Sequence, residues 1–305
     1  MRRAVVAVLF AGLVAGACGD KSQPIEGPEG LPPPLDAGSG TTAQPGSPTP
    51  GSPADGASPT PTAREGTPGA RPGEGPRTTD PPAAKGSDGI AEAARAGVGG
   101  FARTLLQPSP AERIVVDVIF ERGAGPSRAS LDHAVATLRS VTGKEVTTTA
   151  TAVDVSQQSW TGAELRSLAD DAAPTRQGGG TAALRVLFVR GGLADNDGAV
   201  GVAVRADVLA VFADRLDETS SPLVSRSRME DAVLMHEVGH LLGLVDLVID
   251  TGRDDPEHPG HSRNTGSVMY WAVESTLVGQ ALNGPPPTEF DSQDREDLAK
   301  IRSGA

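Results

Sequence analysis

The spacing of hydrophobic and polar positions changes repeatedly between residues 88 and 242, and it predicts an alternation of strands and helices. Runs rich in β-branched residues predict strands at 113–121, 145–155 and 183–190, with one or two more in 200–212. Apolar residues three and four apart predict helices at 130–141, 160–171 and 228–242, and a short amphipathic helix within 88–106. Thr161 is the expected N-cap of the second helix, and Ser227 and Glu230 fit a capping box at the start of the third. This alternation indicates a mixed α/β fold.

The predicted helix at 228–242 contains the sequence H-E-V-G-H at 236–240. Residues four apart lie on one face of a helix, so His236 and His240 can offer two imidazole nitrogens to one ion. Glu237 then lies beside the ion without binding it. A carboxylate in that position can accept a proton from a water that the metal has made acidic, and can pass this proton to the leaving amine. This is the arrangement for peptide hydrolysis.

A third metal ligand is expected shortly after this motif. Gly243 suits the end of the helix, because glycine adopts the left-handed conformation at little cost. The chain can then return Asp246 to the ion as a carboxylate ligand. His258 and His261 in the following loop are the alternative third ligands, or they rim the cleft. Two structural histidines in a buried helix are the other interpretation, but the chain has only 5 histidines, so the extended motif favours a metal site.

The pattern H-E-x-x-H-x-x-G-x-x-D, followed by S-V-M-Y-W at 267–271, resembles the zinc site and methionine turn of the metzincin peptidases. The resemblance implies a twisted mixed sheet with an antiparallel edge strand, a zinc-binding active-site helix and an irregular C-terminal subdomain ending in a helix. It also implies that Met269 forms an apolar floor beneath zinc, and that Tyr270 and Trp271 belong to the substrate pocket. Asp246 resembles the aspartate that is the third ligand in snapalysin-type members.

Two further features relate to particular branches of that clan. The segment 290–298 resembles the start of the matrixin C-terminal helix, with Asp291 or Ser292 as its cap. The resemblance to the clan as a whole also implies that an extended substrate pairs with the strand just before the zinc helix, within 200–211. Matrixins are kept latent by a cysteine on the metal, whereas Cys18 is the only cysteine here. Latency would therefore need another ligand, and intramolecular disulfides are excluded.

The N-terminal part predicts export and attachment to a membrane. Arg2 and Arg3 precede an apolar run too short to cross a bilayer, which predicts a signal peptide at 1–17. Residues 15–18 (AGAC) resemble a bacterial lipobox, which implies a lipid on Cys18. Pro, Gly, Ser and Thr dominate 18–87, so we expect a disordered tether before a metallopeptidase domain at 88–305. The expected location is the bacterial cell envelope, with the protein held by its lipid.

Charge limits the partners that this chain can bind. A formal net charge of −12 and a pI near 4.9 argue against nucleic acid and against attraction to anionic lipids, so membrane attachment would depend on the lipid anchor. The turn D-N-D-G at 195–198 offers oxygen ligands for Ca²⁺. Four residues do not make a calcium loop, and a polar turn closed by Gly198 is the alternative.

Together these features predict a zinc-dependent endopeptidase that acts on protein or peptide substrates, with Glu237 as general base and acid. One alternative is a non-catalytic, surface-anchored lipoprotein that keeps zinc for structure or ligand capture. Glu237 argues against it, because a purely structural zinc site has four protein ligands and needs no base. Another alternative is a different peptidase clan with a distant third ligand such as Glu274, which Met269 disfavours.

Overall fold

The computed structural model describes residues 6–8, 89–220, 224–282 and 284–304. Residues 6–8 are the described part of the predicted signal peptide. Cys18 and the predicted tether at 18–87 lie outside the described residues. The signal peptide, the lipid anchor and the tether therefore stay predictions.

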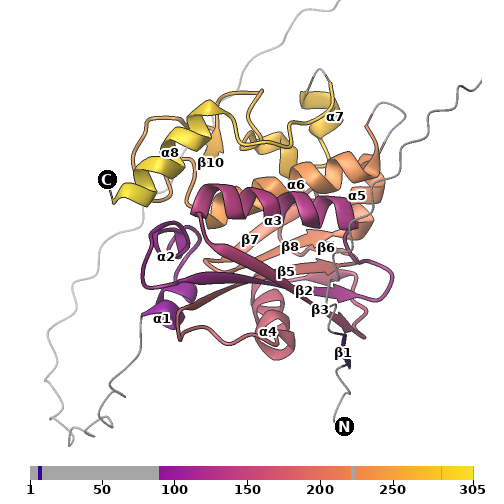
Figure 1. Ribbon diagram of the computed structural model, residues 1–305. Coiled ribbons are helices and arrows are strands. Elements are labelled where there is room, and N and C mark those ends of the chain that lie inside the picture. Colours follow the sequence, from indigo (N-terminus) through magenta and orange to yellow (C-terminus); the bar gives the residue numbers. More distant parts are fainter. Residues whose placement is uncertain (1–5, 9–88, 221–223, 283, 305) are drawn as a thin grey trace, which may run out of the picture. The chain divides into compact units, whose positions relative to one another are not determined.

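A mainly parallel sheet of six strands forms the centre of the domain, in the order β1-β3-β2-β5-β8-β7 (Figure 1). The inner strands β3, β2, β5 and β8 are parallel, while β1 and β7 run antiparallel to their neighbours at the two edges. The bounds are β1 (Val6–Val8), β2 (Arg113–Glu121), β3 (Glu145–Val153), β5 (Thr181–Val189), β7 (Gly201–Arg205) and β8 (Val208–Phe212). The mixed α/β fold that the sequence predicts is confirmed.

Helices cover both faces of this sheet (Figure 1). α3 (Arg128–Thr142) and α6 (Arg226–Leu241) lie on one face, and α4 (Gly162–Ala172) lies on the other. α8 (Ser292–Ser303) is the last helix of the chain. The remaining elements are short: α1 (Ile90–Ala94), α2 (Ala102–Leu106), β4 (Ser159–Trp160), β6 (Gly192–Leu193), α5 (Ala213–Thr219), β9 (Asp254–Asp255), β10 (His258–Ser262), the 3-10 helix η1 (Trp271–Glu274) and α7 (Val278–Ala281).

The two faces of the sheet bury two separate hydrophobic cores. Along β8, Leu209 and Val211 belong to the core that includes α6, whereas Val208, Ala210 and Phe212 belong to the core beneath α4. Successive side chains of a strand point to opposite faces, so this apolar run serves both cores. The packing fixes α6 against the sheet and next to the edge strand β7.

The start of α6 differs from the sequence prediction. Its N-cap is Ser225, whose hydroxyl accepts a hydrogen bond from the backbone N–H of Arg228. Glu230 is fully buried and accepts from the backbone N–H of Ser127, at the start of α3, and from Arg226. The predicted capping box of Ser227 and Glu230 is therefore wrong, because Glu230 joins α6 to α3. Gly243 has a φ of 81° and follows the C-cap, in agreement with the predicted helix end.

Two other termini test the predictions directly. Thr161 caps α4 and forms a capping box with Glu164, and Asp291 caps α8 in the same way with Asp294. The single short helix expected within 88–106 is instead the pair α1 and α2. Gly99 lies between them with a φ of 81°, a conformation that interrupts a right-handed helix.

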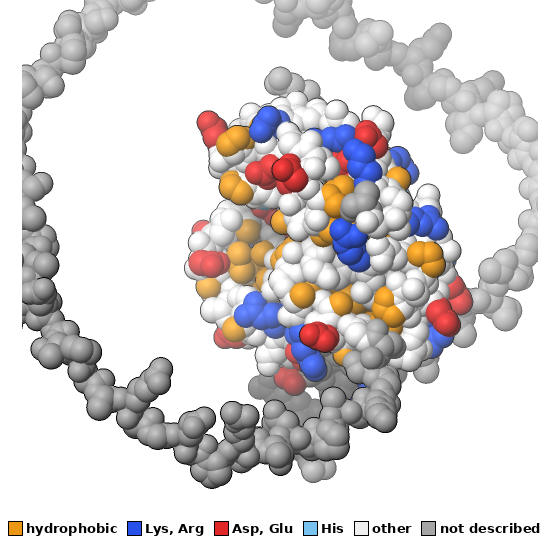
Figure 2. All heavy atoms as spheres, turned by 90° about the vertical axis from the view of Figure 1, so that its left-hand side faces the viewer, with side chains coloured by type: hydrophobic (Ala, Val, Ile, Leu, Met, Phe, Trp, Pro, Cys, Tyr) orange, Lys and Arg blue, Asp and Glu red, His pale blue; other side chains and the backbone are white. Residues whose placement is uncertain are grey.

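The surface and the helix lengths add two observations. Figure 2 shows one face of the domain, on which acidic and basic side chains are interspersed and do not gather by sign. Within the described residues, no helix combines the length and the apolar composition that crossing a bilayer requires.

Candidate metal centre

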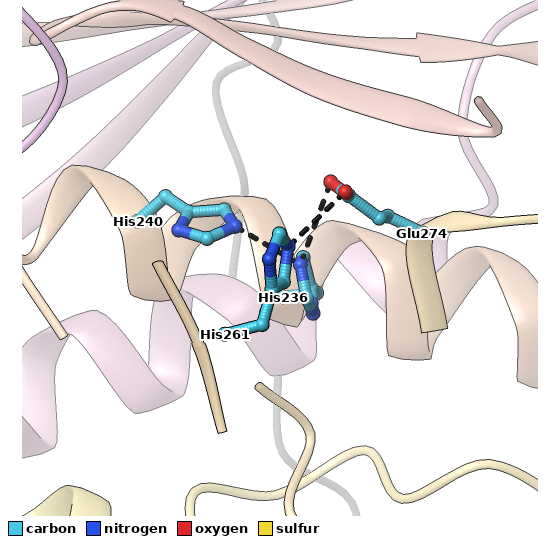
Figure 3. Close-up of side chains that lie close together, drawn as sticks. All are labelled: His236, His240, His261 and Glu274. Carbon is cyan, nitrogen blue, oxygen red and sulfur yellow. Dashed lines mark hydrogen bonds and ion pairs between the residues drawn. The ribbon is translucent and has the colours of Figure 1, made fainter. Parts of the chain in front are cut away.

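Four side chains from three elements bring their ligand atoms together beside α6 (Figure 3). His236 and His240 project from adjacent turns of α6, His261 comes from β10, and Glu274 comes from the end of η1. One ligand atom from each residue lies within 4.8 Å of all the others. Among the described residues, this is the group of side chains that could hold a metal ion. Its ligand atoms are nitrogens and oxygens, which zinc binds.

Three distances within the group are close to those between the ligands of a tetrahedral zinc ion. The Nε2 atoms of His236 and His240 are 3.0 Å apart. The Glu274 carboxylate lies 3.5 Å from His236 Nε2 and 3.1 Å from His261 Nε2. Ligands about 2.0–2.1 Å from a tetrahedral zinc ion are separated from one another by roughly 3.3 Å. These three distances are compatible with one zinc ion, and all four ligand atoms lie within 4.8 Å of one another.

The first histidine is oriented by a backbone carbonyl. His236 is fully buried, and its Nδ1 donates a hydrogen bond to the carbonyl oxygen of Val268 over 2.7 Å. Because a carbonyl only accepts, Nδ1 of His236 carries a proton, and Nε2 is the ring atom that faces the other ligands. The pKa of His240 lies well below its ordinary value, because of burial and the nearby His236. The lowered pKa keeps the His240 ring neutral, the form that binds metal.

Met269 packs against α6 between the two helical histidines. It is fully buried, and a β-carbon at Gly239 would overlap its sulfur and come within 3.2 Å of Phe290. Glycine at 239 thus lets this turn approach the helix closely. The backbone N–H of Ser262 donates to the carbonyl of Met269 over 2.8 Å, which connects this turn to the strand that holds His261.

Asp246, the expected third ligand, lies outside this group. It has a φ of 62°, and its carboxylate accepts hydrogen bonds from the hydroxyl and backbone N–H of Thr251 and from the N–H of Asp254. Burial alone would raise the pKa of Asp246, but these bonds lower it. The carboxylate closes a turn in this structure, and His261, the alternative third ligand, is the residue of this loop that lies in the group.

The other predicted residues of the loop are placed as follows. His258 is not in the ligand group: its ring stacks on Trp271 at a centroid distance of 4.4 Å, and its Nδ1 is 2.9 Å from Asp255. Trp271 lines a cavity of about 500 Å³ that also borders His261 and Glu274. Tyr270 lies at a centroid distance of 5.7 Å from Trp271 and is partly exposed.

Glu237 is the expected general base, and it lies fully buried beside β7. Its hydrogen-bonding neighbours are the Glu274 side chain and the backbone N–H of Ala203, although neither contact has ordinary hydrogen-bond geometry. A β-carbon at Gly201, the first residue of β7, would lie 2.6 Å from one of these oxygens, so glycine there makes room for the carboxylate. Burial and then the negative charge of Glu274 raise the pKa of Glu237 well above its usual value. A raised pKa strengthens the carboxylate as a proton acceptor, which is the role of a general base.

Glu274 has the opposite shift. Burial alone would raise its pKa, but hydrogen bonds and charge from His236 and His261 hold it well below the usual value. The carboxylate is therefore ionised, as a metal ligand must be. The sequence suggests Glu274 as a metal ligand only under the alternative of a different peptidase clan, where it would be the third ligand. No short spacing connects Glu274 to the motif, so the sequence offers no local signal for it.

The turn at 195–198 is closed by polar contacts of its own. Asn196 Oδ1 accepts from the backbone N–H of Gly198 over 3.2 Å, and Asp197 pairs with Arg215. These contacts are those of the polar turn that was the alternative to a calcium site.

Comparison with known proteins gives limited help. No family model matches the chain, and no curated protein matches it. Archaemetzincin from Methanopyrus kandleri is 16% identical, with a TM-score of 0.43, over 63% of this chain and 97% of its own. Archaemetzincin from Archaeoglobus fulgidus, in complex with malonate, is 14% identical, with a TM-score of 0.35, over 60% of this chain and 98% of its own. At TM-scores this low neither likeness decides the activity, which has to be inferred from the site.

Proposed function

We propose that this protein is a zinc-dependent endopeptidase. The observation that supports it is the position of Glu237, a fully buried carboxylate that follows His236 on α6, next to a group of three imidazoles and a carboxylate that could hold a metal ion. A zinc site kept only for structure does not need a second buried carboxylate beside it, whose burial is costly. Hydrolysis of a peptide bond does need one, as a base.

The residues of the site divide the work of that reaction. His236, His240 and His261 would hold the ion. When bound there, zinc supplies Lewis acidity, which makes water acidic enough to attack a peptide carbonyl near neutral pH. Glu237 accepts the proton of the attacking water and delivers it to the amide nitrogen that leaves. The backbone of an extended substrate would add to the edge strand β7, which precedes α6.

A second candidate function follows from Glu274. With this carboxylate, four protein ligands complete the shell, as in zinc sites that serve structure. A surface-anchored zinc protein that binds a ligand without hydrolysing it would have this arrangement. The position of Glu237 favours the peptidase over this alternative.

The deciding experiment uses the purified full chain, with bound zinc quantified, and a library of peptides as substrate. We expect stoichiometric zinc and measurable cleavage in the parent chain. Glu237→Ala should keep zinc and lose about 100-fold or more of the activity, since it removes the base and leaves the ligands. Glu164→Gln, an exposed glutamate on α4, is the matched control and should behave as the parent. Zinc without cleavage in every chain would support the binding protein, and absence of zinc would contradict both candidates.

Cellular attachment is a separate proposal. We propose that a lipid on Cys18 holds the domain at the cell envelope through the tether at 18–87. The support is the apolar run before Cys18, together with the position of this sole cysteine at the expected cleavage site. Cys18→Ser should release the protein from the membrane fraction without changing its zinc content. Retention in the membrane fraction would contradict the proposal.

A further inference from the structure

The position of Glu274 has a consequence for how the site is regulated. Resting on the peptidase proposed above, we infer that Glu274 is a displaceable fourth metal ligand, and that the segment 274–276 covers the site as a built-in cap. Catalytic zinc sites keep one position open for water, whereas structural sites do not. The cap would fill that position until it is moved.

The first support is the geometry of the carboxylate. Glu274 Oε1 is 3.1 Å from His261 Nε2 and Oε2 is 3.5 Å from His236 Nε2, close to the roughly 3.3 Å between ligands of a tetrahedral zinc ion. The three histidines would supply three ligands of a four-coordinate ion, and Glu274 would supply the fourth, in place of an attacking water.

The second support is independent, because it comes from the backbone. Ala199 and Ser275 form an antiparallel β-bridge, in which the N–H of Val200 donates to the carbonyl of Glu274 over 2.6 Å and the N–H of Thr276 donates to the carbonyl of Gly198 over 2.9 Å. Residues 198–200 lead directly into the edge strand β7. Segment 274–276 therefore pairs with the chain in the manner of an extended peptide added to a sheet edge.

The β-bridge and the position of the Glu274 carboxylate together place segment 274–276 as a bound peptide substrate would lie. The main chain of the cap pairs beside the edge strand, and its side chain places an oxygen over the metal position. A substrate that used this part of the edge would compete with the cap for the same backbone groups. Its carbonyl oxygen or an attacking water would compete with Glu274 for the fourth corner.

The surroundings of the cap permit it to move. The Glu274 side chain is 25% exposed, and the cavity of about 500 Å³ borders each residue from Glu274 to Leu277. Leu277, which follows the cap, is 46% exposed, the largest value among the large hydrophobic side chains described. An exposed leucine beside an open cavity is a contact point for an apolar substrate side chain. A peptide that covers Leu277 and enters this cavity would displace the cap.

Glu274 is the residue available to occupy the fourth metal position among the described residues. Its sole cysteine is Cys18, far from the motif in sequence and outside the described residues. Among the described residues, the ligand group contains Glu274 as its only carboxylate. A carboxylate binds zinc less strongly than a thiolate does, so the cap can be displaced without any redox step.

The test compares the full chain with Glu274→Gln and Glu274→Ala, each loaded with Co²⁺ or Zn²⁺. Glu257→Gln, an exposed glutamate in the same subdomain, is the matched control. Three quantities are measured: the visible absorption spectrum of the Co²⁺ form, its titration with acetohydroxamate, and peptide cleavage by the Zn²⁺ form. Circular dichroism checks that each variant is folded.

We expect both Glu274 variants to change the Co²⁺ spectrum and to bind acetohydroxamate at concentrations that leave the parent unchanged. Zinc affinity should fall by about 10- to 100-fold. Cleavage should rise by about tenfold or more, because activity is proportional to the fraction of molecules with an open site. Glu257→Gln should match the parent in all three measurements.

The outcomes separate this inference from the proposed activity. Changed spectra and hydroxamate binding without cleavage in any chain would support the fourth ligand and overturn the peptidase. Unchanged spectra in folded Glu274 variants would overturn the cap, whatever the activity. Changed spectra with cleavage reduced relative to the parent would overturn the cap as well, because Glu274 would then assist the reaction.

Discussion

Single residues at the site are held by contacts that leave one atom free for the metal. The Val268 carbonyl fixes His236, and Gly239 and Gly201 make room for Met269 and Glu237. Asp246 shows the opposite case, because Thr251 and Asp254 saturate its carboxylate. At this scale the structure predicts which side chains matter for zinc and which only support the loop.

The third ligand can be tested by a pair of substitutions. His261→Ala should lower zinc affinity by about 100-fold or more, because it removes a corner of the shell. Asp246→Asn keeps the size of the side chain and should change zinc affinity by less than about tenfold, since its carboxylate binds the turn and not the metal. Competition with a chelator of known affinity measures both. The reverse order of effects would restore Asp246 as the ligand.

His133 is a residue whose protonation should stabilise the fold. Its Nδ1 is 2.8 Å from Asp231 on α6, and its Nε2 is 2.9 Å from Glu289. Burial alone would lower the pKa of His133, but the hydrogen bonds and charges of these two carboxylates raise it above 6.5. The folded chain thus holds the proton more tightly than the unfolded chain does.

The sign of the pH effect follows from that raised pKa. The stabilisation is fully present below pH 6.5, the unfolded value, and is lost as pH rises through the higher folded pKa. Because the pair with Glu289 is largely exposed, we expect about 1 kcal/mol or less at pH 5.5. Denaturant unfolding of the parent and His133→Gln at pH 5.5 and 8.5 measures it. A difference between the two chains that grows with pH would contradict this assignment.

Among the elements, α6 carries most of the site, and its position is fixed at both ends. It starts at the Ser225 cap, is joined to α3 through Glu230, and ends at Gly243. The residues from Ala232 to Leu241 are buried throughout, so the helix cannot rotate without losing its core contacts. This rigidity places His236 and His240 for one ion.

The observed N-cap can be distinguished from the predicted one. Ser225→Ala should lower the free energy of unfolding by about 1 kcal/mol, because the N–H of Arg228 loses its partner. Ser227→Ala, an exposed residue two positions later, should change it by less than about 0.5 kcal/mol. Urea unfolding of both variants makes the comparison. A larger loss of unfolding free energy in Ser227→Ala than in Ser225→Ala would favour Ser227 as the N-cap of α6.

At the scale of the whole molecule, a bound metal would connect distant parts of the chain. The site joins α6 to β10 and to η1, two short elements with little hydrophobic core of their own. An ion that binds only the folded chain stabilises it in proportion to its affinity and free concentration. The irregular part of the domain after α6 should therefore be the part most sensitive to metal loss.

Removal of zinc tests this dependence. At a free zinc concentration about 1,000 times the dissociation constant, the bound ion should add about 4 kcal/mol to the stability. The full chain should show a lower thermal midpoint after dialysis against chelator, with recovery on adding zinc back. Hydrogen exchange should show the loss of protection at 254–276 before that of β2 or β5. An unchanged midpoint would mean that the site does not bind zinc in the fold.

The sequence by itself determined the features that depend on neighbours along the chain. The apolar run at 113–121 became β2, Thr161 and Asp291 became helix caps, and H-E-V-G-H at 236–240 placed two histidines on one face of α6. Periodicity and capping act over a few residues, so a single sequence states them directly.

Only the tertiary structure decided the remaining corners of the site and the role of Glu230. Asp246 had nearer partners in the backbone of its own loop, while His261 and Glu274 came to the metal position from β10 and η1. Glu230 does not cap its own helix and instead accepts a hydrogen bond from the backbone N–H of Ser127, at the start of α3. Such contacts depend on how long loops pack against the sheet and the helices, and the free energy of that packing is distributed over residues far apart in the chain. A local pattern therefore specified the first half of the metal centre, and the fold specified the second.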